Sequence, residues 1–374
     1  MPEPTRAPEL WLQEAWHGRA SPLVRAGLSA AAAAYGVALA ARSAAYRIGL
    51  RSTRGLPVPV ISVGNVTVGG SGKTPLAEVV VLALAEMGAR PAVISRGYGR
   101  RSRGVRIVAD GRGIRVDARD GGDEPVLLAE RLPGVPVVVG ESRYEAGAVA
   151  VEACGAGALV LDDGFQHRTL RKDLEIVVIS GYDPWGNGRL FPRGSLREPL
   201  SSLRRAAMVV VTNPPTPGAA SDIAQALRRQ GSAATVLSGV YHATSLRRGD
   251  DGRAEIPGVL TGRKVLALAG LASPRGFVVT AGQLGAEITA LAAFPDHHWY
   301  TAGDIARVAA RVRETGAEAV LTTEKDWIRL RALPRGDLPF WVLSVRLEMG
   351  ADRGALVEAL GETVSRATMG RRTP

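Results

Sequence analysis

The sequence predicts an α/β fold: a mostly parallel sheet covered by helices on both faces, with a second, smaller α/β lobe. Three observations lead to this prediction. Short β-branched apolar runs alternate with stretches of helical length through the first 212 residues, which is the pattern of a parallel sheet. A glycine-rich loop lies between the first apolar run and the first helical stretch. The length of 374 residues exceeds one ordinary domain core, so two lobes are expected.

The elements of the first lobe follow from its apolar runs. Val58 to Val63 is short and β-branched, and it predicts a buried strand that leads into the glycine-rich loop and a helix over residues 74–87. The other expected strands are at residues 92–95, 105–108, 114–116, 135–139, 158–161, 176–179 and 208–211, with a hairpin between the second and third of these. The other expected helices are at residues 124–131 and 143–153.

The rest of the chain departs from this alternation. Tyr182 to Leu200 is rich in Gly, Pro and Arg and predicts a long functional loop. A second lobe should begin near Asn213, with strands at residues 265–269, 319–321 and 340–345, a helix at about residues 301–314, and a frayed tail after Ser365. We therefore expect an N-terminal helical segment (residues 1–54), a core (residues 55–212) and a second lobe (residues 213–374).

The composition restricts the partners and the compartment. The net charge of +11 favours anionic partners: nucleic acid, anionic lipid or phosphorylated small molecules. Aromatic residues make up only 5% of the chain and do not alternate with basic ones, so stacking on single-stranded nucleic acid has no support. Cys154 is the single cysteine, which excludes an internal disulfide and a thiolate metal site and is typical of a reducing compartment.

Residues 21–50 have an apolar, Ala-rich centre at residues 26–41 that arginines flank. The 19 residues before this segment carry several charges and no clear cleavage site, so we expect no signal peptide. The centre is shorter and less hydrophobic than a membrane-spanning helix. Two interpretations stay open: a helix resting in a membrane interface with its arginines on lipid phosphates, or an ordinary packed helix of a soluble domain. The flanking arginines are Arg25, Arg42, Arg47 and Arg51.

The glycine-rich loop reads VGNVTVGGSGKTP from Val63 to Pro75. Between a strand and a helix, such a loop turns successive backbone N–H groups onto phosphate oxygens. Lys73 would then reach the β- and γ-phosphates of a nucleotide, and the Thr74 hydroxyl would bind Mg²⁺. The general pattern has glycine where this chain has Thr67, so a turn without a nucleotide is the alternative. The expected nucleotide-binding residues are Thr67, Val68, Gly69, Gly70, Ser71, Gly72, Lys73 and Thr74.

A phosphate-binding loop of this kind needs a carboxylate at the end of a neighbouring strand. The apolar run from Ala158 to Leu161 ends in Asp162 and Asp163. Asp162 would hold Mg²⁺ directly or through water. The pattern is common on its own, but beside the loop it makes a nucleotide site the favoured interpretation.

Six short polar motifs remain, and each one alone suits a turn or a helix cap. They read SRGYGR from Ser95, GDEP from Gly122, DDGFQH from Asp162, LREP from Leu196, FPDHH from Phe294 and TTEKD from Thr322. In this order, and with this loop, they resemble the tetraacyldisaccharide 4′-kinase family of lipid A biosynthesis. The resemblance runs from about Trp11 to Leu330, and in that family the loop shares the departure at Thr67.

The resemblance implies a P-loop nucleoside triphosphate hydrolase core with a smaller second α/β lobe. It implies transfer of the γ-phosphoryl group of ATP, with Mg²⁺, to the 4′-hydroxyl of an acylated glucosamine disaccharide 1-phosphate, giving lipid IVA. It also implies a peripheral position on the cytoplasmic face of the inner membrane, held by the N-terminal helix. We expect a monomer without a nucleic-acid partner.

The same resemblance assigns roles to single residues. Asp123 would accept the proton of the sugar hydroxyl, His297 would orient or tune that carboxylate, and Lys73 would neutralise the γ-phosphate. Without the family, His297 would be taken for an exposed loop histidine. Metal ligands are expected at Thr74, Asp162 and Glu198. Substrate contacts are expected from Asp163, Gln166, His167, Arg96 and Tyr98, and from arginines of residues 182–197 toward the 1-phosphate.

Two other classes of protein share parts of this pattern. A P-loop NTPase acting as a metallochaperone-like or nucleic-acid-associated switch would suit the basic charge. The chain lacks the Cys/His and aromatic patterns that such partners need. A soluble small-molecule kinase would suit the loop, but the apolar N-terminal segment with its flanking arginines counts against it.

Overall fold

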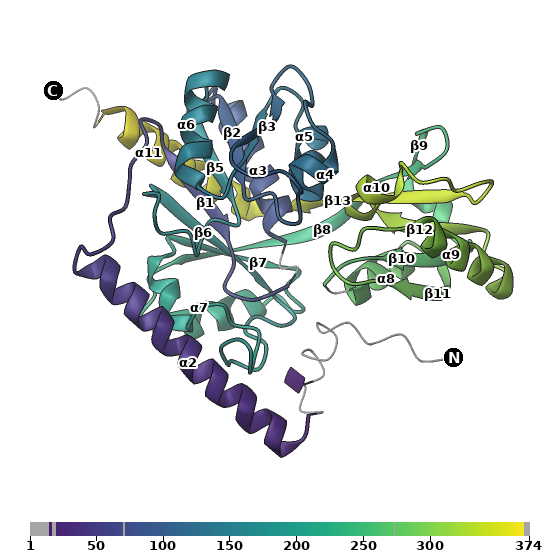
Figure 1. The fold of residues 1–374 in the computed structure, drawn as a ribbon, viewed down its shortest axis with the longest axis horizontal. Coiled ribbons are helices and arrows are strands. Elements are labelled where there is room, and N and C mark those ends of the chain that lie inside the picture. Colours follow the sequence, from purple (N-terminus) through teal and green to yellow (C-terminus); the bar gives the residue numbers. More distant parts are fainter. Residues whose placement is uncertain (1–14, 17–19, 70–71, 273, 370–374) are drawn as a thin grey trace.

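The computed structural model describes residues 15–16, 20–69, 72–272 and 274–369. One sheet of 13 strands runs through the molecule (Figure 1). Its strands follow the order β11-β10-β12-β13-β8-β7-β6-β1-β5-β2-β4-β3, and β9 pairs with β8 off this path. Only β3 with β4, β8 with β13 and β8 with β9 are antiparallel among the described pairs. The predicted mostly parallel sheet is therefore confirmed.

The strands divide into two groups that β8 joins. We call the half built on β1 to β7 the first lobe: β1 (Val60–Gly64), β2 (Pro91–Ser95), β3 (Arg106–Asp110), β4 (Pro136–Val139), β5 (Ala158–Asp162), β6 (Leu174–Ser180) and β7 (Met208–Thr212). After β8 (Thr235–Arg248) comes the second lobe: β9 (Ala254–Glu255), β10 (Lys264–Ala269), β11 (Glu287–Ala293), β12 (Ala319–Thr323) and β13 (Phe340–Glu348).

Helices cover both faces of the sheet, as the sequence predicted. The α-helices are α2 (Pro22–Arg47), α3 (Lys73–Glu86), α4 (Ala118–Gly121), α5 (Asp123–Arg131), α6 (Arg143–Cys154), α7 (Ala219–Arg229), α8 (Pro274–Gln283), α9 (Ala302–Thr315), α10 (Glu324–Leu330) and α11 (Arg353–Met369). Short 3₁₀ helices are η1 (Leu200–Arg205), η2 (Pro257–Leu260) and η3 (Gly350–Asp352). In the first lobe α3, α5 and α11 share one face, and α6 and α7 cover the other.

Burial on both faces explains why the first-lobe strands are apolar along their whole length. In β1, Ile61 and Val63 pack under α3, whereas Val60 points into the cluster below α6. Every residue of β1 is buried. The apolar runs of the sequence therefore predicted these strands to within a few residues.

Strand β8 belongs to both lobes. Its residues 235–239 pair in parallel with β7, and its residues 240–248 pair antiparallel with β13. Helix α11 also returns to the first lobe and packs on α3. The division of the chain at residues 54/55 and 212/213 stays a prediction, to which the structure adds that residues after 213 complete the first lobe.

Helix α2 lies along the outside of the first lobe (Figure 1), where it contacts residues between 166 and 197. It spans 26 residues and is longer than the predicted apolar centre, and Ala32 is its one buried residue. By length and composition α2 would suffice to cross a membrane, with a mean hydropathy of 1.5 over its most apolar stretch. Signal sequences and core helices pass the same test, so this criterion alone is weak.

Several expectations about elements were wrong. Residues 114–116 form no strand of a hairpin; Ile114 makes one isolated bridge to Ala109 on one edge of β3, and β4 pairs with the other edge. The tail after Ser365 is helical as far as Met369, and residues 370–374 lie outside the described part. Sequence reasoning also missed β8, β9, β11, α4, α7, α8, α10 and α11.

Candidate active site

The glycine-rich loop and two of the polar motifs meet at the carboxyl edge of the first-lobe sheet. β1 ends at Gly64, β2 at Ser95 and β5 at Asp162, and β1 lies between β5 and β6. Ligands of open parallel sheets bind outside the carboxyl ends of the strands, where the strand order reverses. This edge is therefore where a bound molecule is expected.

Backbone hydrogen bonds join the glycine-rich loop to the segment that carries the LREP motif. The Val68 N–H donates to the Ser195 carbonyl at 2.7 Å, and the Arg197 N–H donates to the Val66 carbonyl at 2.7 Å. At Gly64 a side chain would meet the backbone of Phe165, so only glycine fits this close approach. Gly70 and Ser71, two of the predicted nucleotide-binding residues, lie outside the described residues.

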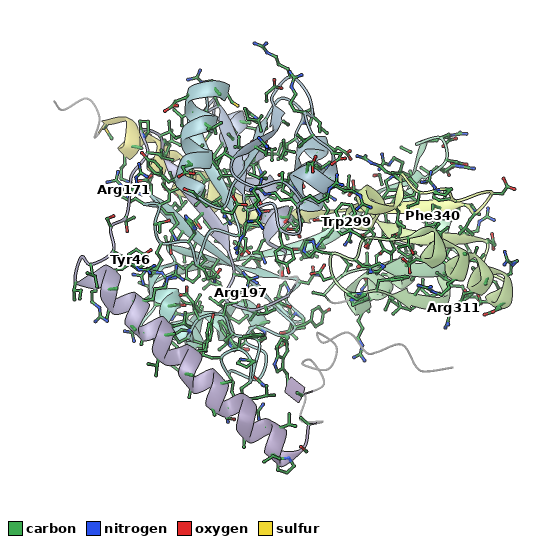
Figure 2. All side chains as sticks on the ribbon, viewed as in Figure 1. Tyr46, Arg171, Arg197, Trp299, Arg311 and Phe340 are labelled. Carbon is green, nitrogen blue, oxygen red and sulfur yellow. The ribbon has the colours of Figure 1, made fainter. Side chains whose placement is uncertain are left out.

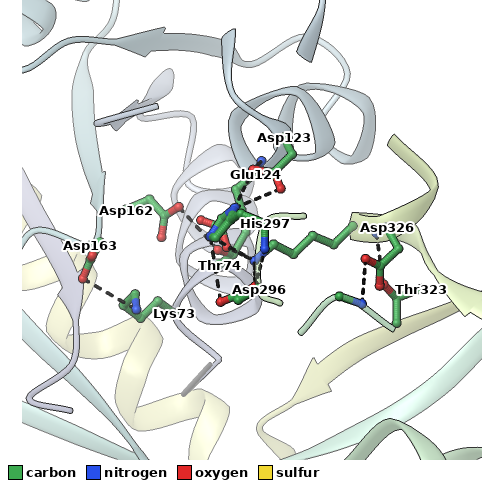
Figure 3. A network of polar contacts seen from close by, with 12 residues as sticks. Lys73, Thr74, Asp123, Glu124, Asp162, Asp163, Asp296, His297, Thr323 and Asp326 are labelled. Atoms are coloured by element: carbon green, nitrogen blue, oxygen red, sulfur yellow. Dashed lines mark hydrogen bonds and ion pairs between the residues drawn. The ribbon is translucent and has the colours of Figure 1, made fainter. Parts of the chain in front are cut away.

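Gly72 ends the loop and caps α3. Its φ of 83° lies in the left-handed region, which favours glycine. A Cβ at this position would overlap the hydroxyl of Tyr241 from β8. Lys73 is the first residue of α3, and its Nζ lies 3.7 Å from Asp163 Oδ1 (Figure 3). The loop, the helix N-terminus and Lys73 together form the cationic, donor-rich end that binds phosphates in proteins.

Thr74 and Asp162 face each other beside this end. The Thr74 hydroxyl donates to Asp162 Oδ2 at 3.4 Å, and Asp162 Oδ1 is buried without a hydrogen-bond partner. Burial, then the charges of Glu124 and Asp163, raise the pKa of Asp162 to about 7. A cation would relieve that repulsion, and the orphaned oxygen could bind it.

This donor set fits Mg²⁺. A threonine hydroxyl and one strand-end aspartate are the protein ligands of Mg²⁺ in P-loop proteins. Within the described ranges no group of three or more His, Cys, Asp or Glu side chains could hold a metal. Such a partial set suits Mg²⁺, because it keeps several waters and takes substrate phosphates as ligands.

Asp163 is paired on its other side with Arg197. Arg197 Nη1 lies 3.0 Å from both Asp163 oxygens. Burial opposes ionisation, but Lys73 and Arg197 outweigh it and hold the pKa of Asp163 below its ordinary value. Asp163 is therefore a charged link between Lys73 and the segment beneath the loop.

Asp123 and His297 come from different lobes and meet near these groups (Figure 3). Asp123 is the first residue of α5, where the helix dipole favours a negative charge. His297 lies between β11 and α9 with φ of 57°, a left-handed conformation that is uncommon for a side-chain-bearing residue. Its Nδ1 is 3.1 Å from Asp123 Oδ1 and 3.0 Å from Asp123 Oδ2. The two residues predicted to act together are thus in contact.

Helix α10 supplies cations to the same contact. Lys325 Nζ lies 2.9 Å from Glu124 Oε1 and 3.3 Å from His297 Nε2. Arg329 Nε lies 3.5 Å from Asp123 Oδ2. Burial alone would raise the pKa of Asp123, but the hydrogen bond with His297 and these cations hold it below its ordinary value. Asp123 is therefore an ionised carboxylate in a nearly dry setting.

One predicted substrate residue, Tyr98, contacts His297, and a second, Arg96, lines the same cleft as Tyr98. The Tyr98 ring centroid is 5.0 Å from that of His297. Tyr98 and Arg96 line a cleft of about 380 Å³ formed by residues 96–103 and Glu141. The cleft opens beside the Asp123–His297 pair, with arginines along its wall.

The other predicted site residues have structural partners. Gln166 Nε2 donates to the Asn65 carbonyl at 2.7 Å and so supports the loop. His167 Nε2 contacts the Thr169 hydroxyl at 2.7 Å, and burial, with nearby arginines, lowers its pKa to about 4. His167 is accordingly neutral at pH 7.

Glu198, which was expected as a metal ligand with Thr74 and Asp162, pairs with an arginine. Its Oε2 lies 2.9 Å from Arg205 Nη2. It lines a cleft of about 540 Å³ between α2 and residues 198–205, which also presents the side chains of Arg42, Arg47, Arg168 and Arg205. The local arginines, rather than a cation at the loop, balance its charge.

Sequence reasoning missed three cations of the site. Lys325 and Arg329 follow the carboxyl end of β12, a position that gathers ligand-binding side chains in parallel sheets and was the available signal. Arg143 is buried at the start of α6, and burial lowers its pKa to about 10 against the attraction of Asp163. Nothing in the sequence distinguishes Arg143 from the many exposed arginines.

A family model described as tetraacyldisaccharide-1-P 4′-kinase (LpxK) matches residues 24–365 of this chain. The chain belongs to the tetraacyldisaccharide-1-P 4′-kinase family. The tetraacyldisaccharide 4′-kinase of Anaeromyxobacter sp. (strain K) is 43% identical over 367 residues, covering 96% of this chain and 97% of that relative. The one from Syntrophus aciditrophicus (strain SB) is 42% identical and covers 80% of this chain and 82% of that relative.

The same family has a solved structure with this fold. LpxK from Aquifex aeolicus, in complex with ATP, aligns with a TM-score of 0.72 and 30% sequence identity. The alignment covers 91% of this chain and 99% of that chain. The resemblance to tetraacyldisaccharide 4′-kinases and the α/β fold predicted from the sequence are thus confirmed.

Proposed function

We propose that this chain is an ATP-dependent kinase that phosphorylates the 4′-hydroxyl of a tetraacyldisaccharide 1-phosphate and gives lipid IVA. Membership of the kinase family supports the reaction class. The observation that carries the proposal is the contact of Asp123 with His297, which supports a base near Lys73 and Thr74 (Figure 3). A switch NTPase of the Ras type orients its water with a glutamine, so a carboxylate–histidine pair favours a hydroxyl acceptor.

The nucleotide would lie along residues 67–74. The backbone N–H groups of the described part of this loop and Lys73 would bind the β- and γ-phosphates, and in that position Lys73 would exchange Asp163 for a phosphate. Mg²⁺ held by Thr74 and Asp162 would neutralise charge on the phosphates. These residues position the γ-phosphate and lower the cost of the charge that develops on it.

Asp123 would take the proton of the acceptor hydroxyl. As the 4′-oxygen forms its bond to the γ-phosphorus, the bond between that phosphorus and the β,γ-bridging oxygen breaks and ADP leaves. The hydroxyl proton passes to a carboxylate oxygen of Asp123. His297 holds that carboxylate in place through its Nδ1.

The acceptor would reach the site from the side of α2. The cleft beside Glu198 combines apolar residues of α2 with Arg42, Arg168 and Arg205, a mixture that suits an acylated, phosphorylated sugar. Glu198 is then a candidate contact to the acceptor. Tyr98 and Arg96 would meet the sugar near the Asp123–His297 pair.

Helix α2 would hold the enzyme on the cytoplasmic face of the inner membrane, where such an acceptor resides. Leu23 and Val37 on its outer side are 84% and 69% exposed. An exposed apolar helix face beside an acyl-binding cleft supports a peripheral membrane position. We also propose that the protein acts as a monomer and needs no nucleic acid.

The test is a kinase assay with the full chain, labelled ATP, Mg²⁺ and detergent-dispersed tetraacyl disaccharide 1-phosphate. We expect a labelled lipid product, and none from a Lys73→Met variant, which controls for contaminating kinases. No labelled lipid across several detergents would overturn the proposal. Hydrolysis stimulated by nucleic acid in place of lipid phosphorylation would instead favour the switch NTPase.

A further inference from the structure

Lys325 holds a central place among the charges around His297. It is the second residue of α10, directly after β12, and its side chain is 16% exposed. Its Nζ lies 2.9 Å from Glu124 Oε1, 3.0 Å from Asp296 Oδ1 and 3.3 Å from His297 Nε2. One ammonium therefore contacts two carboxylates and the ring nitrogen of His297 that does not face Asp123.

An ammonium donates hydrogen bonds and cannot accept them. Burial opposes the charge of Lys325, but the carboxylates of Glu124 and Asp296 outweigh it and keep its pKa above the ordinary value. Lys325 thus stays protonated, and its contact with Nε2 is a hydrogen bond only if Nε2 carries a lone pair. The proton of the neutral imidazole must then reside on Nδ1, facing Asp123.

We propose that Lys325 is a positioning residue that holds His297 in the tautomer protonated at Nδ1, and so makes Asp123 the group that keeps the acceptor's proton. In this tautomer Nδ1–H donates to Asp123 and has no lone pair to receive a proton from it. In the other tautomer a proton taken up by Asp123 would pass on to Nδ1. The ionised Asp123 favours the same tautomer, because a carboxylate only accepts hydrogen bonds. Once Asp123 has taken up the acceptor's proton, the contact of Lys325 with Nε2 is what keeps His297 from relaying that proton.

Other groups around His297 also raise or lower the pKa of its ring. Burial lowers the pKa of His297, the hydrogen bond with Asp123 raises it above its ordinary value, and Lys325 opposes that rise. Removing Lys325 therefore favours a doubly protonated ring. The titratable and charged groups around the imidazole are Asp123 and Glu124 from α5, Lys325 and Arg329 from α10, Asp296 and His298 beside it, and Tyr98 after β2.

The first arm of the test measures the tautomer without turnover. The full chain is labelled with ¹⁵N-histidine, and the five histidines are distinguished with a His297→Gln spectrum. At mildly alkaline pH we expect a pyrrole-type Nδ1 and a pyridine-type Nε2 for His297. In Lys325→Met we expect this pattern to be lost and the ring to protonate at a higher pH than in the unaltered protein. Lys325→Arg keeps a pure donor and should retain the pattern.

The second arm measures kinetics and rests on the proposed function. In Lys325→Met the acidic limb of the kcat/KM profile should move up by about one pH unit, since a cation that lowers the pKa of both Asp123 and His297 is gone. Lys325→Arg keeps the positive charge and should leave the acidic limb at the pH of the unaltered protein. Lys264→Met removes an exposed lysine of the same lobe and should leave the profile unchanged.

The outcomes separate the two proposals. A proton on Nε2 in the unaltered protein, or the same tautomer with and without Lys325, overturns the inference. An equal loss of activity at every pH in Lys325→Met also overturns it, because it shows only a structural role. Absence of any lipid product with the expected tautomer present would overturn the proposed function alone.

Discussion

At the scale of single residues, Asp123 is a buried carboxylate that keeps its charge. Its side chain is 4% exposed. Burial alone would favour the protonated form, and the His297 hydrogen bond with the cations Lys325 and Arg329 reverses that preference. The lowered pKa makes Asp123 a weaker base than a free aspartate, but it keeps the carboxylate ionised and therefore able to accept a proton from a hydroxyl placed beside it.

Asp123→Asn should therefore remove turnover and keep nucleotide binding. The amide has the shape of the carboxylate and cannot accept the hydroxyl proton, so kcat should fall by about 10²–10⁴-fold. Single-turnover phosphorylation and titration with a fluorescent ATP analogue measure the two quantities. Asp110→Asn, at an exposed aspartate paired with Arg115, is the matched control. Equal losses of rate and ATP affinity would make Asp123 a structural residue.

The sequence predicted which residue types form the candidate site more readily than which of these residues contact one another. Gly64, Lys73 and Thr74 lie in one contiguous motif, so spacing alone predicted them. Asp123 and His297 are 174 residues apart, and only the family resemblance paired them. Glu198 stays a predicted metal or substrate contact, and its ion pair with Arg205 could not be foreseen because it depends on how residues 182–205 fold. No local pattern encodes that long loop.

At the scale of elements, α2 presents two different sides. The Tyr35 hydroxyl donates to the Arg197 carbonyl at 2.8 Å, and Arg42 Nη2 donates to the Gln166 carbonyl at 2.7 Å. Arg42 therefore faces the protein and not lipid phosphates, where the sequence interpretation placed it. The outer side is lined mainly by alanines with Leu23 and Val37.

Deleting residues 1–50 should release the protein from membranes, and Val37→Glu should weaken binding on its own. Losing the burial of one valine side chain lowers vesicle affinity by roughly tenfold or more. Sedimentation with vesicles of inner-membrane composition measures both effects. Val279→Glu, at an exposed valine of α8, should leave binding unchanged. Continued sedimentation of the truncated chain would show that another surface attaches the protein.

The two longer strands that sequence reasoning missed, β8 and β11, lack a continuous buried apolar run. β8 alternates buried and exposed residues, contains Gly239 and ends in two arginines, so it has no continuous apolar run. β11 is an edge strand with no fully buried residue. Strands that are buried on both faces can be predicted from their continuous apolar runs. Strands that face solvent have no such run, and they form because of pairing that only the fold supplies.

At the scale of the whole molecule, buried charges connect the two lobes. Glu78 of α3 pairs with Arg131 of α5 at 3.0 Å, and Arg131 also contacts Glu324 of α10. Arg346 of β13 contacts Glu78 from the second lobe. Trp299, labelled between the lobes in Figure 2, packs under Arg119 with 4.7 Å between guanidinium and ring centroid. The helix after the phosphate-binding loop is thereby tied to the helix that carries Lys325.

Arg131→Met should destabilise the fold and slow turnover together. It leaves Glu324 without the arginine it contacts and Glu78 with Arg346 as its remaining cation, which costs about 3 kcal/mol. Thermal unfolding and kcat are the measurements. Arg115→Met removes an arginine from the exposed pair with Asp110 and should cost at most about 1 kcal/mol. An unchanged melting temperature in Arg131→Met would show that the network does not hold the lobes.

The arrangement of the lobes was beyond sequence reasoning. The contacts that set it join residues such as Arg131 and Glu324, which are 193 positions apart. Each of these residues has an ordinary place on a helix, and a charged residue on a helix is usually solvated. These residues are buried because the two lobes dock. The hydrophobic periodicity of the sequence does not predict that docking.

The docking of α11 on α3 also sets the order in which the protein is completed during its synthesis. Leu356 and Leu360 are fully buried in the same cluster as Leu76 and Val80 of α3. Ribosomes add about 5–20 residues per second, so this face of α3 waits on the order of tens of seconds for its cover. The first lobe is therefore synthesised first but completed last. Until α11 has been made, the apolar side chains of α3 that it covers are exposed to chaperones.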